Sequence, residues 1–271
     1  NTIADIGAQG SALRAGDIDA LYDITSAQFS QVSGIEGLTE IQTGTFFSWW
    51  MTQTQKGITG TPEGRAALRY LFDSEQMNAA AYGGEGTATW NPFDETPVGI
   101  GQSVDATYDP AKAKEMLDAA GLGGETLSIL ALEGYEDSER MGQLLEQAAA
   151  EAGIATDFKV LSVADYLGTT YTDPTWDGIV YGAGTLPFPF YDAFGYMILG
   201  NADMSAYIAQ MQGASDEELD ALVTDAQKLM LDETLVLPAF VAPVRTLIPD
   251  NLTGVEATTF GDVRWGKAAF N

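Results

Sequence analysis

The sequence predicts an α/β fold, and its order of elements, its composition and its hydropathy support that prediction. A strand at residues 126–132, a helix at 138–153 and a strand at 154–161 follow one another with short connections. This order is typical of two parallel strands joined by a crossover helix. The chain has 271 residues, of which 45% are hydrophobic, which is enough for one large domain or two smaller ones. No apolar run approaches the roughly 18 residues that a membrane-spanning helix needs.

The N-terminal part predicts a short helix followed by two strands. Residues 11–24 combine a helix that ends at Gly16 with an apolar-alternating strand, and residues 38–51 are rich in β-branched and aromatic residues. This second strand contains four aromatic side chains, Phe46, Phe47, Trp49 and Trp50. They suit the core of a sheet, and they also suit a ligand cleft, because aromatic rings give a large contact area at little entropic cost.

Helix-start signals then predict a helix that begins after Thr61. The hydroxyl of Thr61 caps it, a proline occupies the first turn, and an apolar face continues to Met77 before glycines from Gly83 end the helix. Residues 84–106, which include Trp90, are rich in Gly, Pro and Thr, so we expect a long ordered loop there. Long loops in compact domains are often functional.

Residues 108–122 contain the clearest helix in the sequence. Asp109 is placed to cap the first amides, Pro110 takes the first helical position, and Gly121 can adopt the left-handed conformation that stops a helix. Each end of this helix is therefore specified by residues that are adjacent in the sequence.

The C-terminal half completes the predicted α/β pattern. We expect a strand at 176–181, a helix from Ser215 to Met230 that opens with a capping box, and a strand at 235–244. Residues 182–195 form a glycine, proline and aromatic loop directly after the strand at 176–181. Open α/β sheets bind ligands at the carboxyl ends of their strands, so this loop is a candidate binding segment.

The charge balance excludes several classes of partner. Twelve Lys and Arg stand against 39 Asp and Glu, which gives a formal net charge of -27. Binding to nucleic acid or to an anionic membrane surface relies on basic residues, so neither is expected. A chain this acidic repels itself unless ions screen the repulsion, which favours a salty habitat.

The chain contains no His and no Cys. A Ser-His-Asp triad, a His general base, thiol catalysis, disulfides and His- or Cys-ligated metal sites are therefore excluded. The acidic residues do not form the loop pattern of a calcium site either. The sequence predicts no metal site and no cofactor.

The acidic residues leave two interpretations open. Residues 160–227 contain ten acids and no base, which follows from a base-poor composition or indicates a cleft for a cationic or polyhydroxylated ligand. Paired carboxylates would suit a glycoside hydrolase, but with 39 acids such a pair is not specific. Asp192, in the aromatic loop, is either a helix cap or a ligand contact.

Several motifs in order resemble one known family. YDPAKAKEMLDAAGL (residues 108–122) is the most specific, followed by TPEGRAALRYLFDSEQM (61–77), WDGIVYGAG (176–184) and SDEELDALVTDAQKLMLDETLVLPAF (215–240). Together they resemble the family 5 extracellular solute-binding proteins of ABC importers, which include oligopeptide, dipeptide, nickel and oligosaccharide binders. The resemblance covers about residues 11–245.

The resemblance implies a periplasmic-binding-protein-like fold of type II, cluster C, with two lobes. Lobe two would be complete at residues 44–237, and lobe one partial, at 1–43 and 238–271. The strands near Phe46 and near Pro238 would be the two hinge crossings. Family members are about twice as long, so we expect an N-terminal portion of the same protein to be missing from this chain.

The resemblance also implies a function without chemistry. The protein, or the fragment, would capture a small organic solute at the periplasmic or extracellular surface and pass it to an ABC permease. Peptide binders of the family resemble one another in an acid within the loop after the strand that ends here at Tyr181, whereas this chain has YGAGTLPFPFYDAF. A sugar, an apolar solute or a cationic organic is therefore favoured over a peptide. The alternatives are a structural or assembly fragment without binding activity and a carboxylate-dependent glycoside hydrolase.

The expected ligand-binding residues are mostly aromatic. Each lies on a hinge strand or on a loop that the resemblance places at the cleft, and strand alternation allows only about half of the strand positions to face it. They are Phe46, Trp49, Trp50, Trp90, Tyr181, Phe188, Phe190, Tyr191 and Asp192.

Overall fold

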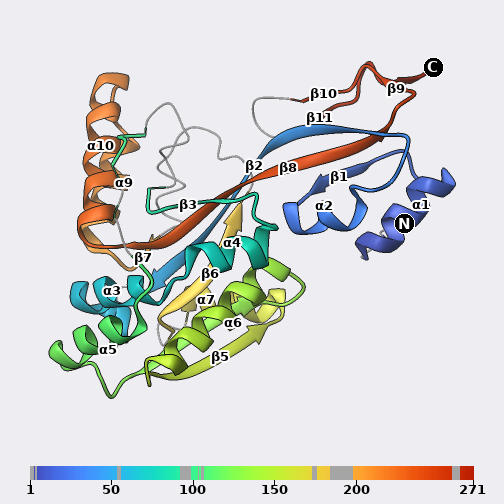
Figure 1. Ribbon diagram of the computed structural model, residues 1–271. Coiled ribbons are helices and arrows are strands. Elements are labelled where there is room, and N and C mark those ends of the chain that lie inside the picture. Colours follow the sequence, from blue (N-terminus) through green and yellow to red (C-terminus); the bar gives the residue numbers. More distant parts are fainter. Residues whose placement is uncertain are drawn as a thin grey trace.

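The computed structural model describes residues 3, 5–53, 56–91, 99–102, 104, 107–172, 176–183, 198–257 and 263–271. Two long antiparallel strands, β2 (Leu38–Gln53) and β8 (Val236–Pro249), run through the molecule (Figure 1). They lie in the middle of a sheet with the strand order β1-β8-β2-β6-β4-β5, in which the outer strands are β1 (Leu21–Ile24), β6 (Gly178–Ala183), β4 (Thr126–Leu132) and β5 (Ala155–Leu161). None of the helices in these ranges is both long enough and apolar enough to cross a membrane.

The β2–β8 pair joins a small unit to a large α/β unit (Figure 1). We call residues 5–42 and 245–271 the small unit and residues 50–237 the large unit. The stretch between them, residues 43–49 and 238–244, is called the crossing segment. Its ladder is bounded by two β-bulges, one with Thr43 as the extra residue on β2 and one with Pro238 as the extra residue on β8.

The small unit contains α1 (Ile6–Ala15), β1 (Leu21–Ile24) and α2 (Ser26–Val32). The predicted helix and strand are confirmed, but α1 begins earlier than residue 11, because the Asp5 carboxylate accepts a hydrogen bond from the Ala8 amide at 2.7 Å. It ends at Gly16 as predicted, with a φ of 75°. The sequence analysis did not predict α2. The core of this unit is separate from that of the large unit and consists of Ile6, Leu13, Leu21, Ile24, Val32 and Leu247.

The large unit contains the predicted crossover. β4 (Thr126–Leu132) lies between β5 (Ala155–Leu161) and β6 (Gly178–Ala183), and all three strands are parallel. α6 (Glu136–Glu151) connects β4 to β5 and packs on all three strands. A further helix, α7 (Val163–Thr172), connects β5 toward β6 and was not predicted. The α/β fold class is therefore confirmed.

The single helix predicted after Thr61 is wrong in one respect, because the chain breaks before Asp73. α3 (Pro62–Leu68) continues into a 3₁₀ turn, η2 (Arg69–Leu71), and α4 (Ser74–Tyr82) starts anew. The Asp73 carboxylate accepts a hydrogen bond from the Gln76 amide at 2.9 Å and so caps α4. The start and the end of the predicted helix, at Thr61 and Gly83, are confirmed.

The other predicted helices of this unit are found close to their expected positions. α5 (Pro110–Ala119) begins at Asp109, whose carboxylate accepts from the Lys112 amide at 3.0 Å. α10 (Asp216–Asp232) begins with the expected capping box at Ser215. The helix α9 (Ala202–Met211) was not predicted. A short strand, β3 (Thr87–Thr89), lies inside the expected loop at 84–106. The remaining elements of the large unit are η1 (Ile58–Gly60), β3 (Thr87–Thr89), β7 (Ile198–Leu199) and α9 (Ala202–Met211).

The small unit also includes the C-terminal end of the chain, which forms two short antiparallel pairs (Figure 1). One pair joins β9 (Leu252–Thr253) to β12 (Ala269–Phe270), and the other joins β10 (Glu256–Ala257) to β11 (Val263–Arg264). Trp265 and Phe270 of this segment are among the large apolar side chains that are exposed.

Candidate functional site

The carboxyl ends of the three parallel strands point toward the small unit. β6 runs antiparallel to β2, with Gly178 opposite Thr52 and Ala183 opposite Phe47, so β6 ends beside the crossing segment. β4 and β5 are parallel to β6 and end at the same edge of the sheet. We call residues 132–135, 160–165 and 181–183 the carboxyl edge. Ligands of open α/β sheets bind outside such an edge.

Exposed apolar side chains mark the carboxyl edge. Tyr135, which follows β4, is 51% exposed, and Val163, which follows β5, is 54% exposed. Val160, near the end of β5, is also exposed. Large apolar groups that remain in contact with water are available to a ligand, so this edge can offer hydrophobic contact.

The loops at this edge are held in place by hydrogen bonds. The Glu133 amide donates to the Leu161 carbonyl at 2.9 Å and so links the ends of β4 and β5. The buried Ser138 hydroxyl accepts from the Leu132 amide at 2.9 Å. In the next loop the Ser162 hydroxyl donates to Asp165 at 2.8 Å. A binding surface on these loops would therefore be largely preformed.

The charge of this edge is negative. Among the residues that define it, Glu133 and Asp165 are acids and none is a base. A carboxylate or phosphate ligand is usually bound through Arg or Lys, so these loops do not favour an anion. Within the described ranges, no three acidic side chains lie close enough together to hold a metal ion.

Two of the expected binding residues, Trp49 and Tyr181, pair at this edge through the backbone register, and a third, Phe46, lies on β2 beyond the last β6 partner. Trp49 on β2 lies opposite Tyr181 on β6 and opposite Ala239 on β8. Phe46 lies three positions earlier on β2, opposite Ala242. All three predicted residues are thus on strands that reach the crossing segment. The four expected residues of the aromatic loop, Phe188, Phe190, Tyr191 and Asp192, lie outside the described residues.

Trp50 and Trp90 belong to the core of the large unit. Trp50 is 0% exposed, and its ring packs edge-on against Phe72 at 5.5 Å between ring centroids. Because a side chain without exposed surface has no face to offer a solute, the core interpretation of the aromatic strand holds for Trp50. Trp90 is 8% exposed. The side-chain amide of the adjacent residue, Asn91, donates to the side-chain oxygen of Gln227 at 3.0 Å, and both of these side chains are buried.

Sequence reasoning did not single out Tyr135 and Val163. The signal that could have found them was position, because each lies just after one of the parallel strands predicted at 126–132 and 154–161. The prediction of binding residues followed aromatic clusters instead, and Tyr135 is isolated in the sequence.

Asp177 stands directly before β6, and its carboxylate is used inside the protein. It is buried, accepts from the Ser128 amide at 2.9 Å and from the Thr59 amide at 3.0 Å. Burial raises the pKa of Asp177, and the amide donors oppose that rise. These bonds tie η1 to β4 and β6, so Asp177 holds the large unit together and is not presented to a solute.

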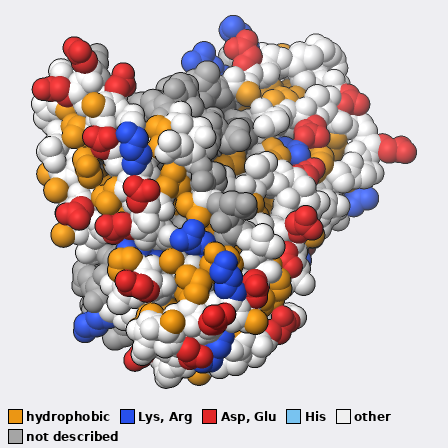
Figure 2. Space-filling model, turned by 60° about the vertical axis from the view of Figure 1, so that its left-hand side comes forward, with side chains coloured by type: hydrophobic (Ala, Val, Ile, Leu, Met, Phe, Trp, Pro, Cys, Tyr) orange, Lys and Arg blue, Asp and Glu red, His pale blue; other side chains and the backbone are white. Residues whose placement is uncertain are grey.

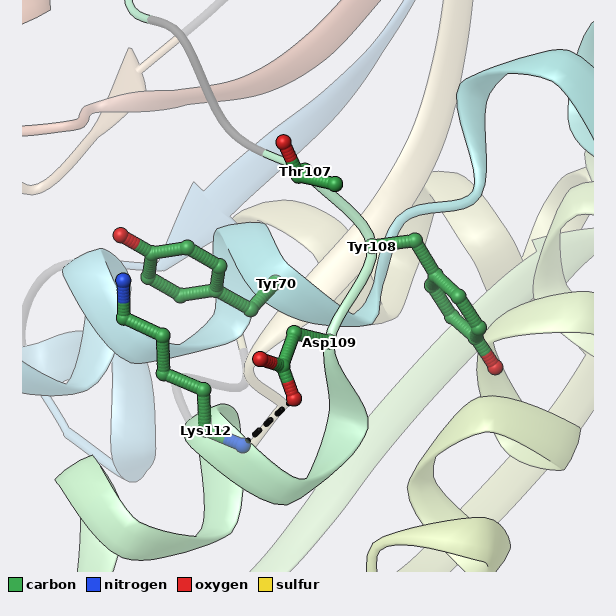
Figure 3. Close-up of a pocket in the computed structure, with 5 residues that line it drawn as sticks. All are labelled: Tyr70, Thr107, Tyr108, Asp109 and Lys112. Atoms are coloured by element: carbon green, nitrogen blue, oxygen red, sulfur yellow. Dashed lines mark hydrogen bonds between the residues drawn. The ribbon is translucent and has the colours of Figure 1, made fainter.

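A separate polar pocket of about 250 Å³ lies at the start of α5 (Figure 3). The Lys112 ammonium lies 4.1 Å from the centre of the Tyr70 ring, while the Tyr108 ring turns away from both. The Tyr108 hydroxyl donates to Glu151 at 2.9 Å, and desolvation together with this bond raises the pKa of Tyr108 to about 12. The charged groups of this pocket already have partners, and its residues are not on the carboxyl edge.

Comparison with known families gives one match over most of the chain. Residues 1–206 match the family described as bacterial extracellular solute-binding proteins, family 5 Middle. The resemblance drawn from the motifs is thereby confirmed.

Curated relatives with established names cover part of the chain. Heme-binding protein A of Haemophilus influenzae is 28% identical over 179 residues, which is 64% of this chain and 32% of that protein. The dipeptide-binding protein of Escherichia coli K12 is 29% identical over 109 residues, 38% of this chain and 20% of that protein. The aligned part of the chain therefore spans about a third or less of the length of these two relatives.

Solved structures share the fold over almost the whole chain. NikA of Brucella suis, in complex with Fe(III)-EDTA, has a TM-score of 0.83 at 18% identity, covering 99% of this chain and 61% of that one. The periplasmic binding protein DppA of Helicobacter pylori, in complex with the peptide STSA, has a TM-score of 0.80 at 18% identity, covering 100% and 56%. The fold is thus that of the type II periplasmic binding proteins, and the chain spans somewhat more than half of their length.

Proposed function

Since the chain belongs to family 5 of the bacterial extracellular solute-binding proteins, we propose that it captures a small organic solute outside the cytoplasm for an ABC permease. The relatives are binding proteins and not enzymes, which favours capture without chemistry. The chain covers only part of their length, so the partner permease and a missing N-terminal portion of the same protein belong to this proposal.

One observation carries the location of the site. The carboxyl edge of β4, β5 and β6 faces the small unit across the crossing segment, and it presents the exposed Tyr135 and Val163. The solute would lie against this edge, between the two units. Binding proteins that close two lobes around a ligand use such a position.

The same arrangement supports the proposed lobes. The bulges at Thr43 and Pro238 coincide with the expected boundaries of residues 1–43, 44–237 and 238–271. Bulges interrupt the regular ladder and increase the local twist, so they are natural places for two strands to bend. The crossing segment between them would act as the hinge.

The solute class follows from the groups at the edge. Aromatic and apolar groups with acids and without a base suit a sugar, an apolar solute or a cationic organic better than an anion. On strands β2 and β6 we propose Trp49 and Tyr181 as contacts, because opposite positions on antiparallel strands act as side-chain pairs. Phe46, three positions earlier on β2, is proposed as a further contact from its place in the crossing segment alone. In the loop after β6, Phe188, Phe190, Tyr191 and Asp192 complete the proposed set.

Calorimetric titration of the chain with a tetrapeptide, a trisaccharide and choline tests this function. We expect saturable binding of the trisaccharide or choline, and no conversion of the bound molecule. Replacement of Trp49 or Tyr181 by Ala should weaken that binding by about 1–3 kcal/mol. Trp265→Ala, on the C-terminal segment, is the matched control and should leave it unchanged.

Two results would favour the alternatives. Hydrolysis of a glycoside panel would indicate a carboxylate-dependent hydrolase. Absence of binding to every probe, combined with a shift in size-exclusion volume when an N-terminal half is supplied, would indicate an assembly fragment without a binding activity of its own.

A further inference from the structure

Arg245 is a nearly buried cation that contacts both units. Its side chain extends from β8, and its Nε donates to the Glu40 carboxylate on β2 at 2.5 Å. A second nitrogen, Nη1, lies 2.8 Å from the Glu85 carboxylate and 3.3 Å from the Ser26 hydroxyl. The guanidinium also lies over the Phe29 ring, 4.4 Å from its centre. In a chain with 12 bases and 39 acids, one cation here serves two carboxylates.

The two carboxylates come from different units. Glu40, on β2, belongs to the small unit. Ser26 and Phe29, on α2, belong to the same unit. Glu85 lies in the large unit, between α4 and β3, and α4 packs into the large core. Figure 1 shows α2 and α4 side by side, and these two helices are in contact.

The turn that carries Glu85 is tightly specified. Gly83 and Gly84 both have positive φ, 62° and 83°, which glycine adopts without strain. On the other side of Glu85, the Asn78 side chain donates to the Gly86 carbonyl at 2.6 Å and accepts from the Gly86 amide at 2.8 Å. The large unit therefore fixes the backbone at Glu85, and the exposed Glu85 carboxylate lies 2.8 Å from Nη1 of Arg245.

We infer that the Glu85–Arg245 ion pair is a latch that fixes the angle between the small and the large unit. Arg245 stands just outside the Thr43 bulge, at the small-unit end of the crossing segment. Glu85 lies two residues before β3, which pairs with residues 239–241 of the crossing segment. If the units rotate about that segment, Arg245 keeps its contacts with Glu40, Ser26 and Phe29 in the small unit, and the contact with Glu85 is the one that changes. The guanidinium keeps one carboxylate and one ring, so opening leaves no unpaired buried charge.

This inference rests on the proposed function, because it treats the two units as moving lobes. The inference goes beyond the proposed function by naming the contact that sets the angle between the two units. This contact lies on the side of the crossing segment that carries α2 and α4. A partly exposed ion pair is worth about two- to fivefold in an equilibrium constant, so its loss should shift the population of open and latched forms by about that factor.

The absence of cysteine allows a clean distance measurement. Cysteines introduced at Ala15 on α1 and Ala150 on α6 are both exposed and would carry spin labels, one on each unit. Pulsed electron resonance on the solute-free chain should give one main distance. Glu85→Gln should raise the share of a second distance by about two- to fivefold, and NaCl should have the same effect on the parent but little further effect on this variant.

Glu40→Gln is the matched control, because it removes a carboxylate from the same cation without breaking a contact between units. It should leave the distance distribution unchanged. The latch is refuted if Glu85→Gln leaves the distribution as in the parent, or if Glu40→Gln changes it equally. Circular dichroism melting of both variants confirms that they fold. Since no solute is present, this outcome is independent of whether the trisaccharide or choline binds.

Discussion

Trp50 and Trp49 are adjacent residues for which different roles are expected. Trp50 is completely buried against Phe72, so replacing it with Ala removes a large core side chain. We expect Trp50→Ala to lower the free energy of unfolding by about 3–5 kcal/mol. Trp49→Ala, by contrast, should change solute affinity with a smaller loss of stability. Urea unfolding and calorimetry on both variants separate the two roles, and equal losses of stability would contradict this assignment.

Asp177 should give stability a dependence on pH. Burial raises its pKa above that of the unfolded chain, so the folded state binds the proton more strongly. Its contribution is therefore fully present below the unfolded pKa and is lost as the pH rises through the folded pKa. As the pH rises, the unfolding free energy of the parent should therefore fall relative to that of Asp177→Asn.

At neutral pH the same substitution should still destabilise the protein. An Asn side chain keeps one acceptor oxygen and has an NH2 group in place of the other. That NH2 group would face one of the two donors, either the Thr59 amide, which now donates to Oδ1, or the Ser128 amide, which now donates to Oδ2. We expect a loss of about 1–3 kcal/mol, measured by urea unfolding at several pH values. A parent-to-variant difference that does not change with pH would show that Asp177 has the same pKa in the folded and unfolded states.

At the scale of elements, the β2–β6 pairing depends on a glycine. A Cβ added at Gly178 would lie 2.8 Å from the Trp50 ring, and that ring is buried and cannot move aside. Gly178→Ala should therefore lower the free energy of unfolding by about 1–3 kcal/mol. Gly168, in α7, has nothing within 4 Å of an added Cβ, and Gly168→Ala should raise it by about 0.5–1 kcal/mol. Thermal unfolding compares the two, and a change of the same sign in both would refute the steric argument.

Elements with local boundary signals were predictable from the sequence. α5 and α10 have capping residues next to their first turns, and their starts agree with the prediction. α2 has a similar signal in Thr25 and Gln28, whose side chains cap it reciprocally, but the segment is only seven residues long. The break before Asp73 depends on a single capping residue inside a continuous apolar pattern, and that pattern predicts one uninterrupted helix.

Features that depend on distant residues were not predictable. β8 continues to Pro249, beyond the expected end at 244, because β1 and the first half of β2 pair with it. The face of the sheet that buries Trp50 is decided by Phe72 and Gly178, which are far from it in the sequence. For the same reason the aromatic pattern alone could not separate core from candidate site, or point to Tyr135.

At the scale of the whole molecule, the net charge of -27 should make stability depend on salt. Acidic side chains spread over the face that Figure 2 shows and do not gather in one patch. Ions that shorten the Debye length, from about 10 Å at 0.1 M to 3 Å at 1 M, weaken repulsion among these acids. They also weaken pairs such as Lys159–Asp157, but the acids exceed the bases more than threefold.

We therefore expect the thermal midpoint to rise by a few degrees as NaCl goes from near zero to about 0.5 M. A shift of this size corresponds to a gain in unfolding free energy on the order of 1 kcal/mol. Differential scanning calorimetry in a series of NaCl concentrations measures the midpoint. A midpoint that stays flat or falls would mean that the acids are spaced or paired well enough for repulsion to be negligible, and the inference of a salty habitat would fail with it.

The central claim is that solute binds at the carboxyl edge, between the two units. Hydrogen exchange with and without the probe that binds in calorimetry, trisaccharide or choline, tests it most directly, because it maps protection along the whole backbone. We predict slower exchange at the carboxyl edge (residues 132–135, 160–165 and 181–183) and in the crossing segment, with no change at the α5 pocket around Lys112. Protection confined to that pocket, or to the C-terminal pairs β9–β12, would contradict the account.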